Sequence, residues 1–384
     1  MSGLYIHVPF CGSLCSYCHF SRTADHSFAV RRRFVDAVCR ELELRRQTCG
    51  LLTGRRRLAT VYLGGGTPSQ LEPELMTRLL AGTLHQFPQA ADLEVTAEAN
   101  PESLTAEKAR AWREAGINRV SLGVQSLNEE VLKLLGRACP PETARKALRL
   151  ACRHFPRVSA DWILGPGLRW DVLRAELQEA IALGVEHFSV YILELHAGTE
   201  LEQKVRRGAV TLLPDEETEA QYLALVRFLD EQGFRHYEVS NFARPGAGSR
   251  HNQGYWRRRP WLALGPAAHG GYGRRRYANL SDVGAYCAAV EAGRIPEESE
   301  DPLDLRARLL ERIILGLRTA AGVPLAWLAP HCLDWEAGRV EGLWRTDGGR
   351  LRLTPRGFLI IDAIEARIRP AGAGCGRVDT AKGH

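Results

Sequence analysis

Two hydrophobic patterns alternate along the first 240 residues. Short runs rich in Val, Ile, Leu, Phe and Tyr are typical of buried parallel strands, and the segments after them carry apolar residues at helical spacing. The predicted strands are residues 4–8, 60–63, 93–98, 119–123, 157–164 and 187–193. The predicted helices are residues 28–45, 72–85, 105–115, 129–135, 142–154, 171–183 and 215–232.

Six strand–helix repeats predict an α/β fold with a parallel sheet and right-handed crossovers. The pattern does not say whether the sheet closes, and six units are too few for a complete eight-stranded barrel. In either case ligands are expected at the carboxyl ends of the strands, where the loops meet.

The pattern changes after residue 233. Residues 235–242 read as one more strand, and residues 243–280 read as a loop rich in Gly, Pro and Arg. We therefore divide the chain into a core (1–240), a connecting segment (241–302), a C-terminal module (303–369) and a tail (370–384). The tail is rich in glycine and is expected to be disordered.

The C-terminal module has the order helix, helix, hairpin, helix. These elements are expected at residues 303–319, 324–331, 343–353 and 355–369, with the hairpin turning at Asp347-Gly348-Gly349. The order resembles a winged helix, a fold that can bind nucleic acid. Because no helix of the module concentrates basic residues, we expect no nucleic acid partner and interpret the module as a barrel lid or a surface for docking a partner.

Composition places the chain among ordinary globular proteins. It has 384 residues, of which 45% are hydrophobic and 25% are charged. No apolar run is long enough to cross a bilayer, and no secretory signal or Arg/Ser-rich leader precedes Tyr5, so a cytoplasmic location is expected.

The net charge is +6, with arginine runs at residues 31–33, 55–57, 257–259 and 274–276. Such runs usually mark a solvated face, but for the last two a role in binding anions is left open.

Three of the ten cysteines are clustered. Cys11, Cys15 and Cys18 have the spacing C-x3-C-x2-C in the loop after the first strand. Three thiolates can ligate three irons of a four-iron cluster and leave the fourth iron open. In radical S-adenosylmethionine (SAM) chemistry that open iron binds SAM. The alternatives are a zinc site, which usually has four ligands in paired spacing, or incidental thiols. The other cysteines are dispersed and are expected to be free thiols: Cys39, Cys49, Cys139, Cys152, Cys287, Cys332 and Cys375.

Polar residues follow the other predicted strands. Residues 64–69 read Gly-Gly-Gly-Thr-Pro-Ser, and glycines there let the backbone approach a ligand such as the methionyl amine of SAM. Glu98, Gln125, Arg137 and Asp161 lie in or after the next strands. Each alone could be a solvated or capping residue. Together they lie at one sheet edge and suit the ribose hydroxyls and the carboxylate of SAM.

Taken together, these motifs resemble a known family. The combination Y-I-H-x-P-F-C-x3-C-x-Y-C, GGGTPS, EANP, GVQSL and LGR resembles the oxygen-independent coproporphyrinogen III dehydrogenase family of radical SAM proteins, from residue 5 to about 355. The resemblance implies a partial (β/α)6 barrel of the TIM type, a 4Fe-4S cluster, and a C-terminal helical, winged-helix-like module. Tyr17 would shield the cluster and meet the adenine. The implied SAM contacts are Tyr5, Gly65, Gly66, Thr67, Glu98, Gln125, Arg137 and Asp161.

Two features are similar to the haem chaperone (HemW) branch of this family. The dehydrogenases carry a further cysteine two residues after the third cluster ligand, where this chain has Phe20. The chaperone branch has Phe there and an H-N-x-x-Y-W motif, which matches residues 251–256. The resemblance implies that this motif binds haem. Imidazole is a suitable axial ligand, aromatic rings can contact the macrocycle, and the nearby arginines can pair with propionates. The candidates are His251, Asn252, Tyr255 and Trp256. Without the resemblance, the segment reads as a loop whose aromatic residues anchor it to the barrel.

Two functions follow from the resemblance. In the first, the protein carries haem as cargo and delivers it to an acceptor, such as a membrane-associated respiratory protein, while a reducing partner serves the cluster. In the second, it is an oxidoreductase that decarboxylates coproporphyrinogen III in porphyrin biosynthesis. Phe20 and the 251–256 motif favour the first. Whether the protein is an enzyme stays open, and no catalytic residue is predicted.

The chain also departs from the family pattern. Residues 165–168 read Gly-Pro-Gly-Leu where the family has Gly-Leu-Pro-Gly-Gln. His196 stands where the family has Glu, and His19 replaces the more usual Asp or Asn. These departures indicate a divergent lineage and leave productive SAM cleavage open.

Overall fold

The computed structural model describes residues 2–19, 23, 27–46, 57–328, 331–332 and 335–370. Its centre is a curved sheet in which six parallel strands follow one another in chain order. The sheet does not close on itself, because its order ends at β12 on one side and β7 on the other, which confirms the partial barrel. The six strands are β1 (Ser2–Val8), β2 (Leu58–Gly65), β3 (Gln89–Ala99), β4 (Arg119–Gln125), β5 (Arg157–Leu164) and β6 (His187–Ile192).

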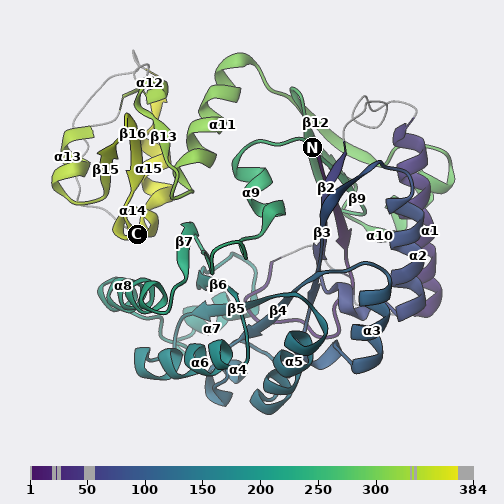
Figure 1. The fold of residues 1–384 in the computed structure, drawn as a ribbon, viewed down its shortest axis with the longest axis horizontal. Coiled ribbons are helices and arrows are strands. Elements are labelled where there is room, and N and C mark those ends of the chain that lie inside the picture. The colour runs from purple at the N-terminus through teal and green to yellow at the C-terminus, as the bar shows by residue number, and fades with distance from the viewer. Residues whose placement is uncertain are drawn as a thin grey trace.

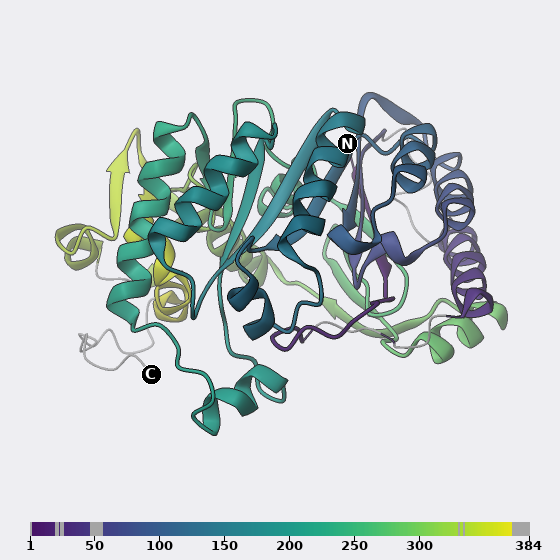
Figure 2. The same cartoon turned by 90° about the horizontal axis from the view of Figure 1, so that it is seen from below.

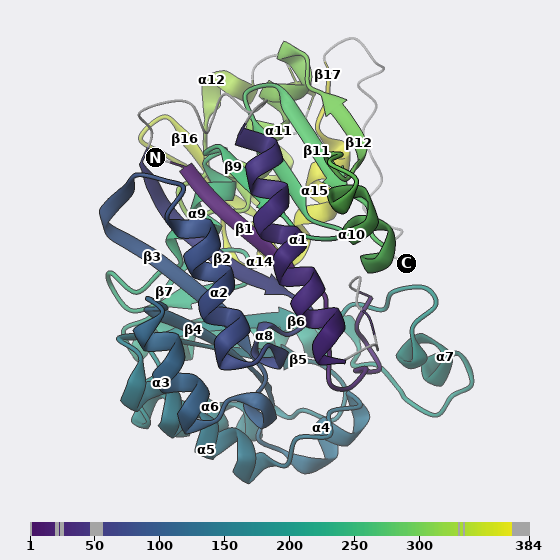
Figure 3. The same ribbon diagram turned by 90° about the vertical axis from the view of Figure 1, so that its right-hand side faces the viewer.

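Helices cover the outer side of the curved sheet (Figure 1; Figure 2 shows the same layer from below). The predicted helices are confirmed, with shifts of one residue at most ends. A further short helix, α7 (Glu200–Arg206), was not predicted and projects away from the others (Figure 3). The outer helices are α1 (Phe28–Arg46), α2 (Pro73–Leu84), α3 (Ala106–Glu114), α4 (Glu129–Leu134), α5 (Pro141–His154), α6 (Trp170–Ala182) and α8 (Asp215–Glu231).

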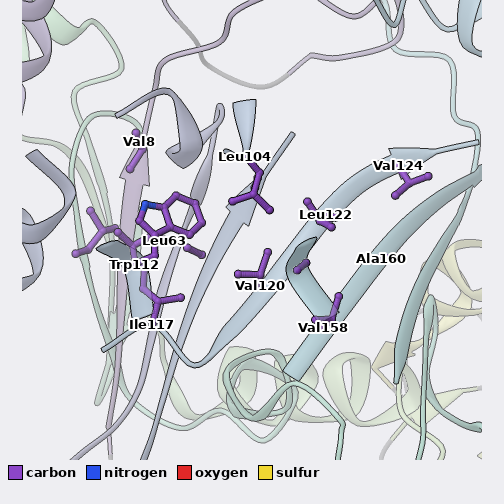
Figure 4. Close-up of a cluster of buried hydrophobic side chains, with 14 of the residues drawn as sticks. Val8, Leu63, Leu104, Trp112, Ile117, Val120, Leu122, Val124, Val158 and Ala160 are labelled. Atoms are coloured by element: carbon purple, nitrogen blue, oxygen red, sulfur yellow. The ribbon is translucent and has the colours of Figure 1, made fainter. Parts of the chain in front are cut away.

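Successive residues of each strand alternate between two faces of the sheet. Leu63, Val120 and Leu122 point outward and are fully buried, together with Trp112 of α3 (Figure 4). The inward positions are mostly polar, including Thr60, Tyr62, Glu98, Ser121 and Asp161. The apolar set therefore forms the core beneath the helices, and the polar set lines the inside of the barrel.

Residues 235–280 differ from the prediction, and no element was predicted for residues 281–302. The single strand expected at 235–242 is two antiparallel strands, β7 (Arg235–Glu238) and β8 (Asn241–Ala243). The expected loop at 243–280 is also wrong, because β9 pairs parallel to β1 and β10–β12 extend the sheet. Strands of four to six residues separated by tight turns are too short to show a clear period. The elements are α9 (Arg250–Trp256), β9 (Trp261–Leu264), β10 (His269–Tyr272), β11 (Arg275–Asn279), α10 (Val283–Glu291) and β12 (Glu297–Pro302).

A buried polar network joins this segment to α1. Glu41 and Arg45 form an ion pair of 2.7 Å, and neither side chain is more than 2% exposed. The Glu41 carboxylate also accepts hydrogen bonds from the Gly265 amide (2.9 Å) and the Tyr286 hydroxyl (2.6 Å). Arg45 donates to the Asn279 side chain (2.8 Å). Since a buried charge is tolerated only with partners, the network fixes where residues 261–290 dock.

The C-terminal module has its own apolar core, which includes Ile313, Leu317, Leu351 and Phe358. The predicted first helix and hairpin are confirmed. The helix expected at 324–331 is only four residues long, and the last helix is two helices separated at Ile360. The module consists of α11 (Leu305–Leu317), β13 (Val323–Pro324), α12 (Leu325–Leu328), β14 (His331–Cys332), α13 (Trp335–Val340), β15 (Trp344–Asp347), β16 (Arg350–Leu353), α14 (Pro355–Leu359), α15 (Ile361–Arg367) and β17 (Arg369–Pro370).

Some predictions fall on residues that the structure does not describe. Phe20 is one of them, as are Cys49, Cys375 and the tail from residue 371 onward. Cys39, Cys139, Cys152 and Cys287 are free thiols, as expected, and burial raises the pKa of each to about 11.

Within the described residues, no helix has the length and apolar character needed to cross a membrane.

Candidate functional site

The three clustered cysteines line one cavity of about 420 Å³ at the carboxyl ends of the parallel strands. Tyr17 lines the same cavity, and burial raises the pKa of its hydroxyl. Tyr5 does not line it. Its side chain is half-buried inside the barrel, with its hydroxyl 3.1 Å from Nδ1 of His7. The predicted residues that share the cavity with Cys11, Cys15 and Cys18 are Gly65, Gly66, Thr67, Glu98, Gln125, Arg137 and Asp161.

The cysteine loop is anchored on both sides by Ser16. Its amide donates to the Leu135 carbonyl (3.1 Å) and its hydroxyl to the Leu134 carbonyl (3.1 Å). A Cβ on Gly136 would lie 2.9 Å from the Ser16 nitrogen, so only glycine lets the two backbones approach this closely. On the other side, the Ser16 carbonyl accepts from the Leu201 amide (2.8 Å). The loop is therefore fixed before any ligand binds.

Arg137 connects the cysteine loop to the ends of β3 and β4. Its guanidinium lies 3.5 Å from Sγ of Cys15 and donates to Oδ1 of Asn100 (3.2 Å) and to the Gly123 carbonyl (2.8 Å). Arg137 Nε is buried and has no hydrogen-bond partner among the described residues. A buried cation with an unused donor beside a thiol is suited to hold anionic groups.

The glycine loop after β2 lies directly against the cysteine loop. A Cβ on Gly66 would lie 2.8 to 2.9 Å from backbone atoms of Val8, Pro9 and Phe10. Gly65 has φ +111°, and a Cβ there would lie 2.6 Å from the His7 ring. These positions require glycine, and the close approach leaves backbone polar groups facing the cavity. Thr67 places its hydroxyl 3.7 Å from Sγ of Cys11.

Two buried carboxyl groups face the same cavity. Burial raises the pKa of Glu98 to about 7. Hydrogen bonds from the Tyr62 hydroxyl (2.6 Å) and the Gly65 amide (3.3 Å) act in the opposite direction and lower it. Burial likewise raises the pKa of Asp161 to about 6, while a hydrogen bond from Ser121 (3.1 Å) lowers it. A cation entering the cavity would stabilise both carboxylates.

Gln125 has a backbone conformation that is rare for a residue with a side chain. Its φ is +68°, at the end of β4 where it lines the cavity. Such strain is typical of binding sites, where the surrounding structure holds a residue in an unfavourable conformation. This supports its assignment as a site residue.

The donors present fit the expected groups. Three thiols line one cavity, which suits a four-iron cluster in which each thiolate ligates a different iron and one iron stays open. Among the residues that the structure describes, no three His, Cys, Asp or Glu side chains, the three cysteines included, are grouped closely enough to share a single metal ion, and three thiols would also leave a tetrahedral zinc site one ligand short. The glycine backbone, the carboxyls and Arg137 suit a ligand that carries an amine, a carboxylate and hydroxyls, as SAM does.

The 251–256 motif lies elsewhere, at the amino ends of the strands. His251 is 2% exposed, and its ring nitrogens are 2.8 Å from the Thr60 and Tyr255 hydroxyls. Its ring stacks on Tyr62 at 5.2 Å, and burial lowers its pKa to about 3. Both nitrogens are engaged, so the axial ligation expected of His251 does not fit this geometry. The space beside the motif, lined also by Ser2, Gly3 and Trp261, is about 10 Å³ and too small for a macrocycle.

The other members of the motif belong to the same arrangement. They lie on α9, whose first turn is capped by Ser249, which accepts from the Asn252 amide (3.2 Å). Glu94 of β3 accepts from the amides of Arg250 (3.2 Å) and His251 (3.0 Å). Tyr255 packs edge-on against Trp261. The motif therefore closes the amino end of the barrel, which agrees with the anchoring interpretation.

The nearby arginines are also engaged within the fold. Arg258 and Arg276 both pair with Glu311 of α11, the latter at 2.9 Å. Arg275 pairs with Glu297 and Glu300 of β12 at 2.5 and 2.9 Å. The expected pairing with haem propionates is therefore not supported for Arg258, Arg275 and Arg276.

The three departures from the family pattern lie in different places. Residues 165–168 form a turn, with the Leu168 amide donating to the Gly165 carbonyl (3.2 Å), and do not line the cavity. His19 and His196 do line it, and their ring centroids are 3.6 Å apart.

Sequence reasoning missed several supporting residues. Asn100 bridges two of the predicted residues. Its side chain accepts a hydrogen bond from Arg137 (3.2 Å) and donates one to the Thr67 hydroxyl (3.3 Å). Tyr62 and Ser121 hold the two carboxyls. The signal was present for Asn100, because strand alternation places it on the same face as Glu98 in the EANP motif.

Comparisons with known proteins identify the family to which the chain is similar. Residues 5–180 match the model of the radical SAM superfamily. The chain is 38% identical over 367 residues to the protein named "Heme chaperone HemW" of Mycobacterium tuberculosis, covering 94% of this chain and 93% of that protein. It is also 38% identical over 386 residues to the bovine (Bos taurus) "Radical S-adenosyl methionine domain-containing protein 1, mitochondrial", covering 94% and 86%.

A solved structure shows the same fold. The coproporphyrinogen III oxidase HemN of Escherichia coli, described as a radical SAM enzyme, superposes with a TM-score of 0.79 over 95% of this chain and 89% of that chain. The sequence identity is 22%, so this likeness concerns the fold alone.

Proposed function

Because this chain belongs to the radical SAM superfamily and, within it, to the heme chaperone HemW family, we propose that it is a haem chaperone. It binds haem as cargo, carries a 4Fe-4S cluster with SAM, and delivers the haem to an acceptor protein. A separate reducing partner serves the cluster. The likeness to the E. coli oxidase concerns fold, so decarboxylation of coproporphyrinogen III is the outcome that the experiments below must exclude.

The observation that carries the cluster and SAM assignment is the shared cavity of Cys11, Cys15 and Cys18. The three thiolates would hold three irons, and Arg137, 3.5 Å from Cys15 Sγ, would stabilise their negative charge. When bound and reduced, such a cluster would supply the electron that activates SAM. Thr67, whose hydroxyl is 3.7 Å from Sγ of Cys11, and Tyr17, which lines the same cavity, would shield the bound cluster from water.

The remaining residues of the cavity would orient SAM. The Gly65–Gly66 backbone provides polar groups for the methionyl end, while Glu98 and Asp161 provide carboxylates for ribose hydroxyls and for the sulfonium charge. Because both carboxyls are buried, a positively charged ligand favours their ionised form. Gln125 and Arg137 complete the polar wall.

The cluster assignment is tested on anaerobically purified protein. We expect iron and sulfide near four per chain and the absorption and electron paramagnetic resonance (EPR) signals of a four-iron cluster, all abolished in Cys15→Ala. Cys152→Ala changes a thiol on α5 outside the cavity and is the matched control. A normal cluster in Cys15→Ala would overturn the assignment.

The chaperone assignment is tested by transfer. Protein loaded with haem is mixed with a haem-free acceptor, and the haem is followed by its Soret band after the two proteins are separated. We expect movement of haem to the acceptor and no conversion of coproporphyrinogen III to protoporphyrinogen IX under reducing conditions with SAM. Sustained conversion would instead establish the oxidoreductase function.

A further inference from the structure

Two histidines from distant parts of the chain meet at the cavity that contains the cysteines. His19 follows Cys18 directly, and His196 lies in the loop between β6 and α7. Their ring centroids are 3.6 Å apart with an angle of 41° between the planes. Both rings line the cavity, and the His196 side chain is 35% exposed. Solvent can therefore reach an imidazole beside the cluster site.

The loop that carries His196 is held in place. The His196 carbonyl accepts hydrogen bonds from the amide (3.2 Å) and the hydroxyl (2.8 Å) of Thr199, the N-cap of α7. The amide of Leu201 in α7 donates to Ser16 of the cysteine loop (2.8 Å). The two loops thus form one unit, and the His19–His196 contact is a consequence of this attachment.

The His196 ring differs from His251 in its hydrogen bonds. Neither nitrogen of His196 is hydrogen-bonded to a residue that the structure describes, and Nε2 lies 3.7 Å from a carboxylate oxygen of Glu194. A histidine that ligates a metal commonly donates its second N–H to a carboxylate. At 3.7 Å, Glu194 is beyond hydrogen-bond distance but within ion-pair range, so a small movement of its exposed side chain would let it accept that proton.

An apolar wall adjoins this pair. Tyr191, Ile192 and Leu193 at the end of β6 line the cavity, as does Ile163 of β5. Tyr191 is 45% exposed, which is unusual for a large aromatic side chain on a strand. The cavity is therefore polar along β2–β5 and apolar along β5–β6, and its apolar side offers a contact surface for one face of a flat apolar ring system.

From this arrangement we propose that His196, supported by His19, is the axial ligand of cargo haem at the mouth of the cluster cavity. The inference rests on the proposed function, because it assigns a site to the haem that a chaperone carries. Rings in contact leave no room for an iron and its macrocycle between them, so one histidine ligates and the other packs against it. His196 is the ligand because its loop also provides the carboxylate and adjoins the apolar wall.

The test is titration of ferric haem into anaerobically prepared protein that contains its cluster. Binding is followed by the Soret difference spectrum and by EPR of the haem iron. In His196→Gly we expect the spectrum of axial imidazole ligation to be lost and the affinity to fall about tenfold or more, the scale of losing a metal-site partner. Adding free imidazole should restore the spectrum, which a merely structural role would not allow.

Matched variants separate the possible outcomes. His85→Ala removes an exposed histidine at the end of α2, remote from the cavity, and should bind like the unaltered protein. His19→Ala should weaken binding without changing the ligation spectrum. Failure of the unaltered protein to bind haem would refute the proposed function itself. Normal haem binding and an unchanged spectrum in His196→Gly would refute only the assignment of His196 as the axial ligand, and another residue would then ligate the haem iron.

Discussion

Single side chains decide which histidine can serve the haem. His251 was the expected ligand, but its two ring nitrogens are 2.8 Å from the Thr60 and Tyr255 hydroxyls. His196 has no such partners among the described residues and lines the cavity. Residue type and motif spacing alone could not distinguish the two, because the difference lies in which end of the barrel each reaches.

The structural role of His251 leads to the first prediction. His251→Ala should lower the free energy of unfolding by about 2–4 kcal/mol, since it leaves two buried hydroxyls unpaired and opens a small cavity. His251→Gln retains hydrogen-bonding capacity and should lose less. Chemical denaturation measures both values, and haem titration of the folded variant should match the unaltered protein. A selective loss of haem binding in a stable His251→Ala would contradict this view.

The second prediction concerns the Glu98 carboxyl and pH. Burial raises its pKa from the ordinary value of 4.5 to about 7, so the folded state favours the protonated form. Its contribution to stability is therefore complete below pH 4.5 and is lost as pH rises through 7.

Glu98→Gln removes this titration. In protein without ligands, we compare the free energy of unfolding of the variant with that of the unaltered protein. The difference in favour of the variant should be larger at pH 8 than at pH 5, by on the order of 1–3 kcal/mol. Urea unfolding at both pH values gives the comparison. Glu130→Gln, whose side chain is 84% exposed in the unaltered protein, is the control and should show no such trend. An equal difference at both pH values would mean that the Glu98 pKa is not raised.

At the scale of elements, the glycine loop after β2 depends on close backbone contact. Gly66→Ala would place a Cβ 2.8 Å from the Phe10 carbonyl oxygen and the Pro9 carbonyl carbon, where backbone cannot yield cheaply. We expect about 1–3 kcal/mol of destabilisation by overpacking. The displaced loop should also weaken SAM binding about tenfold.

Gly254→Ala is the matched control for this change. Gly254 lies within α9, and its Cβ would meet only Arg259 Cβ at 3.9 Å, an ordinary contact. Since alanine is favoured over glycine in a helix, this variant should be neutral or slightly more stable. Equilibrium binding of SAM and thermal unfolding of both variants provide the measurement, and equal SAM affinity in the two would contradict the close-contact argument.

Predictability differed between elements for a physical reason. The strands and helices up to residue 232 are long enough to show their periods, and the polar residues at their carboxyl ends shared one sheet edge as predicted. The prediction for residues 235–280 failed because strands of three to five residues lie between turns there. Their pairing is set by long-range contacts such as Tyr277 with Ala263 (2.9 Å) and Asn279 with Arg45 (2.8 Å). Contacts between residues so far apart in sequence leave no local signal.

The whole molecule depends on how the C-terminal module joins the barrel. The Val239 amide donates to the Arg318 carbonyl (2.9 Å), and His236 packs against Phe358. Glu311 of α11 receives two arginines from the barrel side, Arg258 and Arg276. Figure 1 shows α11 between the rest of the module and β12 at the edge of the core sheet. The module is therefore attached at several points and not by its linker alone.

The strength of this attachment gives the last prediction. Arg258 and Arg276 are 9% and 20% exposed, so removing the Glu311 charge leaves two poorly solvated cations close together. Glu311→Gln should weaken docking of α11 by about 1–3 kcal/mol. Glu219→Gln breaks a more exposed pair with Arg356 at 2.7 Å and should cost less than about 1 kcal/mol. Hydrogen exchange of residues 305–317 should therefore accelerate in the first variant and stay nearly unchanged in the second. Equal acceleration in both would mean that burial of the arginines does not determine docking.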